Sequence, residues 1–243
     1  MNQPIIRWTI GPTTKDGFEV LEKSVNRFGK IYPEFRRIVC YNQIKKNNLP
    51  YFENKVELYE QKENDIDIML HSYQFEPNKS GSIGSGWKLC PPRFDKNAHE
   101  LWIDNDIIIR NKISSINAWL NSENVFLCLE GKYRIYGFYD SQIPKSIKIC
   151  AGFFGIPPKF DFNEKIIKKY HELKEPLGGY NEQGLVASIL SEQENCIYIP
   201  QSQFKNLEQN ETLTEDFLAI HFVGVNRSKH KAWEEYKIKN ILI

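Results

Sequence analysis

The feature that most constrains the fold lies at the amino terminus, where a strand, a helix and a second strand follow one another closely. Ile5–Ile10 is a short apolar run that ends at Gly11-Pro12. Apolar residues then recur at helical spacing from Phe18 to Phe28, and Arg37–Tyr41 is a second strand-like run. Two strands joined by one helix pair in parallel within a sheet. We therefore predict an α/β fold whose sheet begins as a parallel one.

The rest of the chain predicts a mixed sheet. Three β-rich runs follow one another without room for crossover helices, which favours antiparallel pairing; they are Val125–Leu129, Tyr133–Tyr139 and Ile147–Cys150. Later segments have the patterns of two helices, two strands and a basic terminal helix, namely Phe162–Leu173, Glu182–Glu192, Ile197–Ile199, Phe217–Phe222 and Lys229–Lys239. The Gly- and Ser-rich stretch Lys79–Gly86 is short, so we interpret it as a mobile loop within one domain.

Charge and cysteine usage exclude several classes of function. With 32 Lys and Arg against 31 Asp and Glu, the net charge of +1 gives no global field toward nucleic acid, so no nucleic-acid partner is expected. The five cysteines are widely spaced and lack a Cys-x-x-Cys pair, which indicates reduced core residues of a cytoplasmic protein. We find no secretory signal and no apolar run near the ~20 residues that span a bilayer.

The segment with the clearest chemical meaning is an acidic triplet between two apolar runs. Asp104 and Asp106 flank Asn105, with three apolar residues on either side. A strand that is apolar throughout is buried on both faces, so carboxylates at its end are costly unless their charge is cancelled. In extended chain the two carboxylates point to one side, where Mg²⁺ or Mn²⁺ would remove their repulsion. A metal-free hairpin from Trp102 to Ile109, with the triplet at its tip, explains the triplet equally well.

A second polar segment closes a later apolar strand. His221 follows four apolar residues, and Gly224 comes three positions later, where backbone could approach a ligand closely. Arg227 begins a basic cluster suited to phosphate. An imidazole nitrogen beside two carboxylates would favour Mn over Mg. The alternative is a core histidine bonded to a backbone carbonyl, with an ordinary turn and a solvated helix start after it.

Together the two segments resemble the family 8 glycosyltransferases, which have the GT-A fold. The shared pattern is Asp-x-Asp at a strand end, followed far along the chain by His-Phe-x-Gly-x-x-basic. Between these motifs, Cys150–Phe154 resembles the family's Asn-Ala-Gly segment, and Asn181–Gln183 stands where the family carries Asp-Gln. Trp8–Gly11 is similar to its first nucleotide-binding strand and loop. The family usually has Lys where Arg227 stands and Asp where Glu182 stands.

The resemblance implies a site for a divalent cation and the diphosphate of a nucleotide-sugar. Asp106 and His221 would bind Mn²⁺ or Mg²⁺, and Asp104 would share the ion or hold the ribose. Gly224 and Arg227 would cradle the diphosphate. The residues implied beside the base and ribose are Thr9, Ile10 and Gly11.

The resemblance also implies contacts with the sugar and the acceptor. Lys88 and Arg93 would contact the donor phosphates or sugar, although solvated surface charge explains both residues equally well. Glu182 and Gln183 would face donor sugar and acceptor, with Glu182 as a base or as a stabiliser of positive charge at the anomeric carbon. The alternative is an ordinary helix start that Asn181 caps. The substrate-binding residues implied by the Asn-Ala-Gly segment are Ala151 and Gly152.

These expectations combine into a single GT-A domain over residues 1–243, with a nucleotide-binding half at about 1–110 and an acceptor half at about 111–243. Its central sheet would be mixed, mostly parallel and flanked by helices. We expect transfer from a UDP-sugar to a glycan, lipid-linked or protein acceptor. The terminal helix would either touch an anionic membrane weakly or pack against the sheet. Two rivals are a sugar nucleotidyltransferase, for which Gly11–Lys15 is poor in glycine, and a non-catalytic carbohydrate-binding protein of the same fold.

Overall fold

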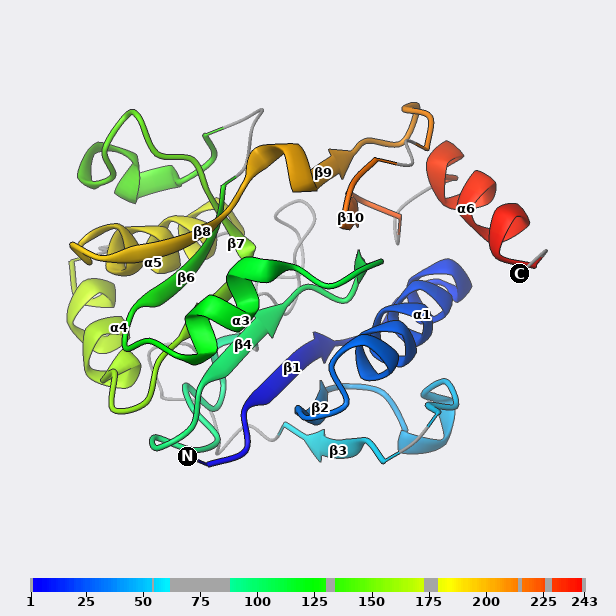
Figure 1. Ribbon diagram of the computed structural model, residues 1–243, viewed down its shortest axis with the longest axis horizontal. Coiled ribbons are helices and arrows are strands. Elements are labelled where there is room, and N and C mark those ends of the chain that lie inside the picture. The colour runs from blue at the N-terminus through cyan, green and yellow to red at the C-terminus, as the bar shows by residue number, and fades with distance from the viewer. Residues whose placement is uncertain are drawn as a thin grey trace.

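The computed structural model describes residues 2–53, 55–61, 88–129, 134–172, 179–213, 216–225 and 229–241. Its main sheet contains, within these ranges, the strands β1 (Ile5–Ile10), β2 (Arg36–Tyr41), β3 (Glu57–Glu60), β4 (Glu100–Ile103), β6 (Val125–Leu129), β7 (Ile149–Ile156) and β8 (Cys196–Ile199). Their spatial order is β3-β2-β1-β4-β7-β6-β8 (Figure 1). β3, β2, β1 and β4 run parallel, β7 is antiparallel to its two neighbours, and β8 is parallel to β6. The predicted mixed, mostly parallel sheet is confirmed.

The strand–helix–strand unit at the amino terminus forms as predicted. Helix α1 (Lys15–Ile31) joins β1 to β2, and the side chain of Thr14 caps its first turn. Phe28 of this helix packs edge-on against Trp8 of β1, with ring centroids 5.8 Å apart. The predicted loop Lys79–Gly86 lies outside the described residues.

Helices cover both faces of the main sheet. Helix α3 (Ser114–Leu120) shares a core cluster with α1. Helices α4 (Phe162–Tyr170) and α5 (Gly179–Ser191) contribute to a second cluster. Strand β7 separates the two clusters, because Phe153 belongs to the first and its neighbour Phe154 to the second. The result is a three-layer α/β arrangement.

A smaller sheet follows β4 along the chain. Its described strands are β5 (Ile107–Ile109), β9 (Phe204–Leu207) and β10 (Ala219–Phe222), with β10 in the middle. Helix α6 (Lys231–Ile241) packs on this sheet through Trp233, whose ring lies 5.4 Å from that of Phe222. The terminal helix therefore packs against a sheet, which was one of its two predicted placements. Among the described helices, none has both the length and the apolar character needed to cross a bilayer.

One predicted strand, Tyr133–Tyr139, is wrong. Residue 133 lies outside the described residues, and Gly137–Gln142 forms a 3-10 helix, η4. Gly137 has φ +53°, a left-handed conformation incompatible with a continuing strand. The guanidinium of Arg134 donates to four backbone carbonyls of the same region and fixes it. Two further 3-10 helices are η1 (Lys46–Asn48) and η5 (Gln201–Gln203).

The other predicted elements are confirmed with shifted ends. The antiparallel pairing expected for the β-rich runs holds for β6 and β7. The helices predicted after residue 160 correspond to α4, α5 and α6, and the late strands correspond to β8 and β10. The four cysteines whose side chains the structure describes form no disulfide; they are Cys40, Cys90, Cys150 and Cys196.

Candidate metal and donor site

The acidic triplet lies in a turn that joins the two sheets. The amide of Asp104 donates to Gly152 O at 2.7 Å, which extends the pairing of β4 with β7. Ile107 N donates to Asp104 O at 3.2 Å and closes the turn before β5. The hairpin that the sequence allowed as an alternative is wrong, because β4 and β5 belong to different sheets. The turn instead carries the carboxylates to the junction of those sheets.

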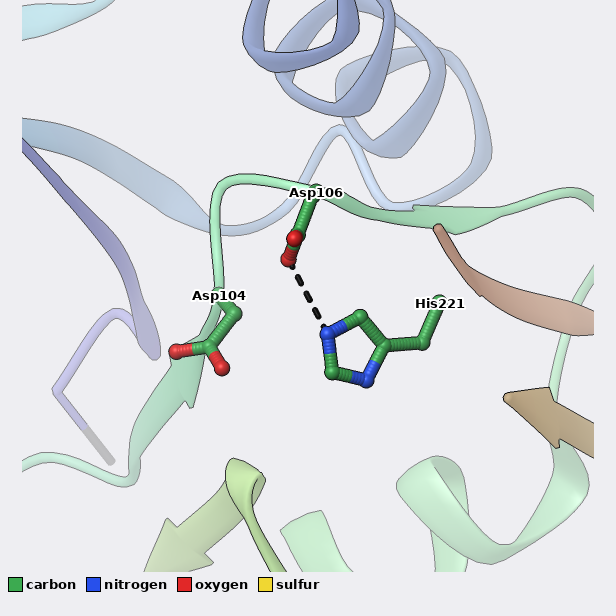
Figure 2. A group of neighbouring side chains, drawn as sticks. All are labelled: Asp104, Asp106 and His221. Carbon is green, nitrogen blue, oxygen red and sulfur yellow. Dashed lines mark ion pairs between the residues drawn. The ribbon is translucent and has the colours of Figure 1, made fainter. Parts of the chain in front are cut away.

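Three side chains converge at this junction (Figure 2). Antiparallel pairing of β10 with β5 sets His221 opposite Ile107, the residue after Asp106. One ligand atom from each of Asp104, Asp106 and His221 lies within 4.8 Å of the other two. Asp106 Oδ1 and His221 Nε2 are 3.1 Å apart. The side chains keep 32%, 14% and 12% of their exposure in chain order, so the cluster is sheltered but reachable.

The ring of His221 is oriented by an asparagine that the sequence analysis missed. Parallel pairing of β9 with β10 sets Asn206 directly opposite His221. His221 Nδ1 lies 3.0 Å from Asn206 Oδ1 and donates its proton to that oxygen. Nε2 therefore faces Asp106 and the rest of the cluster. The register of β9 against β10 brings the two residues together, and no local pattern in the sequence signals it.

Charge pairing shifts the pKa values of two cluster residues. Burial disfavours the imidazolium of His221, but Asp106 and Cys150 together outweigh burial and raise the pKa of His221 well above its ordinary value. Burial also disfavours the charged form of Asp104, but Lys88 and His221 together lower the pKa of Asp104. The carboxylates of the cluster therefore stay ionised because positively charged side chains lie beside them. A divalent cation can take the place of these positive partners.

Gly152 leaves space for the carboxylate of Asp104. A Cβ atom at position 152 would collide with Asp104 Oδ2, so any larger residue would displace this side chain. The neighbouring Ala151 accepts a hydrogen bond from Lys88 Nζ through its carbonyl oxygen. The two residues predicted to bind substrate thus border the candidate metal cluster, and their contact with substrate stays a prediction.

Lys88 connects the cluster to helix α5. Its Nζ atom lies 2.7 Å from Asp104 Oδ1, 2.6 Å from Ala151 O and 3.8 Å from Glu182 Oε1. Its side chain is 12% exposed, so the alternative of a solvated surface charge is wrong for Lys88. Burial disfavours the ammonium, but the carboxylates of Asp104 and Glu182 raise the pKa of Lys88. A permanent cation is therefore held beside the candidate ligands.

Arg93 has a different environment. Its side chain is 9% exposed, so solvated surface charge is also the wrong description here. Its guanidinium donates to four backbone carbonyls, those of Asp95, Ala98, Pro157 and Phe160. These contacts tie the loop before β4 to the chain after β7. They support a structural role, and the donor contact of Arg93 stays a prediction.

The first turn of α5 is not capped in the way the sequence suggested. Gly179 and Tyr180 already belong to the helix, so Asn181 lies within the helix rather than before it. Asn181 Oδ1 accepts a hydrogen bond from Phe138 N at 2.8 Å. The alternative that Asn181 caps this helix is therefore wrong, and Asn181 instead joins α5 to η4.

Glu182 is buried beside Lys88 with one oxygen unsatisfied. Its side chain is 9% exposed, and Oε1 makes no hydrogen bond within the described structure. Burial is the largest influence and raises the pKa of Glu182 to about 7, while Lys88 opposes the shift and Asp104 adds to it. A carboxyl group in this state can take up or release a proton near neutral pH. The next residue, Gln183, donates through Nε2 to Ile135 O at 3.0 Å.

The residues predicted to contact the nucleotide lie at strand ends. The register that sets Arg7 opposite Trp102 brings the carboxyl ends of β1 and β4 to one edge of the sheet. Thr9 and Ile10 close β1, and Gly11 follows them there. Such an edge is where open α/β sheets bind ligands.

Beyond β10, Gly224 has φ +78°, a conformation that glycine adopts without strain. Residues 223–225 form a turn, which fits both the close approach to a ligand and the ordinary turn that the sequence allowed here. Arg227, the basic residue predicted to share the diphosphate, lies outside the described residues.

No protein-family model matches the chain, and no curated protein sequence matches it. Solved structures do match. An active-site mutant of LgtC gives a TM-score of 0.64 at 13% identity, over 98% of this chain and 95% of that one. The galactosyltransferase LgtC in complex with donor and acceptor sugar analogues gives 0.62 at 12% identity, over 98% and 94% of the two chains. The chain has the GT-A fold.

A third similar structure is that of WbbM, a bifunctional glycosyltransferase. Its TM-score is 0.62 at 12% identity, over 99% of this chain and 50% of that chain. At such identities the likeness establishes the fold alone. Membership of family 8 stays a prediction.

Proposed function

We propose that this protein is a metal-dependent glycosyltransferase that transfers a sugar from a nucleotide-sugar to an acceptor. The observation that carries the proposal is the convergence of Asp104, Asp106 and His221 within 4.8 Å, at a sheet junction of a GT-A fold. Two carboxylates and an imidazole suit Mn²⁺ or Mg²⁺. The buried pair of Lys88 and Glu182 beside them adds groups suited to a phosphate and to a proton.

The cluster fits a divalent cation in its chemistry and its surroundings. One ligand atom from each of the three side chains lies within 4.8 Å of the other two, so all three would reach one ion after small side-chain movements. Asn206 already holds the Nδ1 side of His221, which leaves Nε2 for the ion. The absence of a side chain at Gly152 keeps space for the Asp104 carboxylate.

When bound, such an ion supplies Lewis-acid stabilisation to the leaving diphosphate. Among the protein groups, Lys88 orients Asp104 and would offer its ammonium to the donor phosphate or sugar. Glu182, with an unbonded Oε1 and a pKa raised to about 7, would accept a proton or stabilise positive charge at the anomeric carbon. Gln183 would face the donor sugar and the acceptor from the same turn of α5.

In this proposal the donor is a UDP-sugar, a choice that comes from the resemblance to family 8. Base and ribose would lie beside Thr9, Ile10 and Gly11 at the end of β1, with Asp104 sharing the ion or holding the ribose. The diphosphate would lie between the ion and Gly224, with Arg227 as a further positive partner. Because Gly224 has no side chain, its backbone would be able to approach the ligand closely.

We further propose that residues 1–243 form one domain. Strand β4, from the nucleotide-binding half at about 1–110, pairs with β7, from the acceptor half at about 111–243, which supports one unit. The acceptor would be a glycan, a lipid-linked sugar or a protein, and the enzyme would act in the cytoplasm. Any peripheral membrane contact through α6 would be weak, because Trp233 and Tyr236 face the core while Ile238 is exposed.

The proposal is tested by a donor screen with the whole chain. Thermal shifts would be measured with UDP-, GDP- and CMP-sugars, each with and without Mn²⁺, because a ligand that binds the native state raises its melting temperature. We expect the largest shift for a UDP-sugar plus Mn²⁺, followed by slow hydrolysis of that donor without acceptor. A shift without hydrolysis or transfer would favour a carbohydrate-binding protein. No shift with any donor would contradict the proposal.

A further inference from the structure

A buried arginine in the central strand β1 contacts the segment that carries Lys88. Arg7 is 1% exposed, and its Nη1 lies 3.2 Å from Oε1 of Glu100, which is completely buried. A buried ion pair is commonly no more stable than apolar side chains of the same volume, because both charges lose their hydration. The stability of the sheet therefore does not explain why this position carries a charge.

The guanidinium of Arg7 binds three carbonyls within one short segment. Nη1 donates to Pro91 O at 2.5 Å, and Nη2 donates to Cys90 O at 3.0 Å and to Lys88 O at 3.3 Å. Nη1 also donates to Glu100 Oε1. The rigid fork of the guanidinium thus fixes the relative positions of these carbonyls, which a single-point ammonium could not do.

Further side chains restrict the same segment. The guanidinium carbon of Arg7 lies over the rings of Phe94 and Trp102, 4.8 Å and 5.0 Å from their centroids. Trp102 Nε1 donates to Lys88 O at 3.3 Å, and Phe94 N donates to Glu100 Oε2 at 2.9 Å. The backbone that carries Lys88 is therefore anchored to the buried pair from several directions.

We propose that Arg7 is a positioning residue for the site: it fixes the backbone at Lys88 so that the lysine ammonium meets Asp104 and Glu182. The lysine side chain has many rotamers, and a fixed backbone limits where its ammonium can lie. A displacement of about 1 Å at such a group can cost on the order of a hundredfold in rate. The kinetic consequence rests on the proposed function, whereas the placement of Lys88 does not.

A matched control lies on the neighbouring strand. Arg37 of β2 is also buried, with 8% exposure, and donates to Lys55 O at 3.1 Å. Arg37→Met removes a buried arginine from the same sheet without removing a bond to the Lys88 segment. Any effect that both variants share reflects general loosening of the sheet rather than positioning.

The first experiment measures how fast acetic anhydride modifies Lys88, with mass spectrometry as the readout and no donor present. We expect Arg7→Met to accelerate acetylation of Lys88 about tenfold, because its segment opens locally. The acetylation rate of Arg7→Lys should lie between those of the native protein and Arg7→Met. Arg37→Met should leave the rate unchanged. If Arg7→Met does not fold, Arg7→Met/Glu100→Leu removes both charges and takes its place. Unchanged Lys88 reactivity in a folded Arg7 variant, or equal acceleration by Arg37→Met, would overturn the proposal.

The second experiment asks whether Arg7 acts through Lys88. kcat/KM for the donor would be measured for Lys88→Met, for the Arg7 variant and for their combination. We expect the combined variant to match Lys88→Met alone, because a missing ammonium cannot be misplaced. Losses that multiply would overturn the positioning role. If the native protein turns over no donor, the proposed function fails while the acetylation result still decides the role of Arg7.

Discussion

Strand β4 carries one acidic residue at its start and another just beyond its end, and the surroundings of the two carboxylates differ. Glu100 is fully buried and is matched by Arg7 and a backbone amide. Asp104 keeps 32% exposure and belongs to a cluster whose neighbour Glu182 has an unbonded oxygen. Protein groups fully pair the carboxylate of Glu100, whereas the site around Asp104 can still bind a ligand.

This difference separates two uses of buried charge along one short strand. A pair completed by protein groups can fix conformation, and the Arg7–Glu100 pair holds the segment that leads to Lys88. A cluster of ligand atoms that remain accessible can bind an ion from solution, and Asp104, Asp106 and His221 form such a cluster. Changes at the first should therefore affect folding most, and changes at the second should affect ligand binding most.

The largest loss of folding stability is expected from breaking the buried Arg7–Glu100 ion pair. Glu100→Leu leaves the Arg7 guanidinium buried without its carboxylate and should lower the free energy of unfolding by about 3–5 kcal/mol. Urea denaturation measures the change. Glu57→Leu is the matched control, since Glu57 pairs with Arg36 while keeping 43% of its exposure, and should cost less than about 1 kcal/mol. Equal losses would show that burial does not distinguish the two pairs.

In the cluster of Asp104, Asp106 and His221, removal of a ligand should weaken Mn²⁺ binding most. The next largest loss of Mn²⁺ affinity is expected when a new side chain displaces one of the ligands. Gly152→Ala forces the Asp104 carboxylate away from its place and should weaken Mn²⁺ binding by roughly a hundredfold. Isothermal calorimetry with Mn²⁺ checks this. Gly29→Ala also creates a collision, with the guanidinium of Arg37, and should affect stability but not Mn²⁺ affinity. Unaltered Mn²⁺ affinity in Gly152→Ala would mean that Asp104 is not a ligand.

A smaller effect is expected from the residue that orients the histidine. Asn206→Ala removes the partner of His221 Nδ1 and should weaken Mn²⁺ binding by about tenfold. Asn206→Asp keeps an acceptor oxygen and should retain most of the affinity. The same titrations serve as readout, and a loss in Asn206→Asp as large as in Asn206→Ala would argue against an orienting hydrogen bond.

The smallest effect concerns a third charged contact, at the surface between α1 and α6. Asp16 is desolvated by burial, but hydrogen bonds from Lys237 at 3.0 Å and Trp233 at 3.1 Å lower its pKa below the ordinary 3.8. A depressed carboxyl pKa stabilises the fold above the unfolded pKa and loses that contribution as pH falls through the folded one. Asp16→Asn should therefore cost at most about 1 kcal/mol at neutral pH.

The pH dependence of that cost tests its origin. Denaturation of both forms from neutral to strongly acidic pH should show the difference shrinking once the pH falls below 3.8. A difference that stays constant over this range would assign the effect to packing rather than charge. Either way, the measurement gives the contribution of a partly exposed ion pair, with which that of the buried pair at Glu100 can be compared.

Much of the fold follows from local patterns. Ile5–Ile10 is a short apolar run ended by Gly11-Pro12, and the helix after it has apolar residues at helical spacing; both elements form as predicted. The predicted strand Tyr133–Tyr139 is wrong because this β-rich run contains Gly137, whose positive φ, together with the backbone contacts of Arg134, imposes a 3-10 helix. Local periodicity does not report such side-chain contacts to backbone.

The site could be predicted only where its residues have their own signature. The acidic triplet and His221 were recognised from their position at strand ends, and the structure brings them together. Asn206 was missed because its role depends on the register of β9 against β10. Lys88 could not be told from a surface lysine, because its burial depends on Asp104 and Glu182 arriving from other elements.

The most direct measurement is the affinity of UDP with and without Mn²⁺ for the native protein and for Asp106→Ala, determined by isothermal calorimetry. Asp161→Ala is the control, because Asp161 caps helix α4 and takes no part in the cluster. We predict that Mn²⁺ strengthens UDP binding to the native protein and to the control, and that this enhancement disappears in Asp106→Ala while the melting temperature stays native-like. An enhancement in Asp106→Ala as large as in the native protein would contradict the assignment of the metal site.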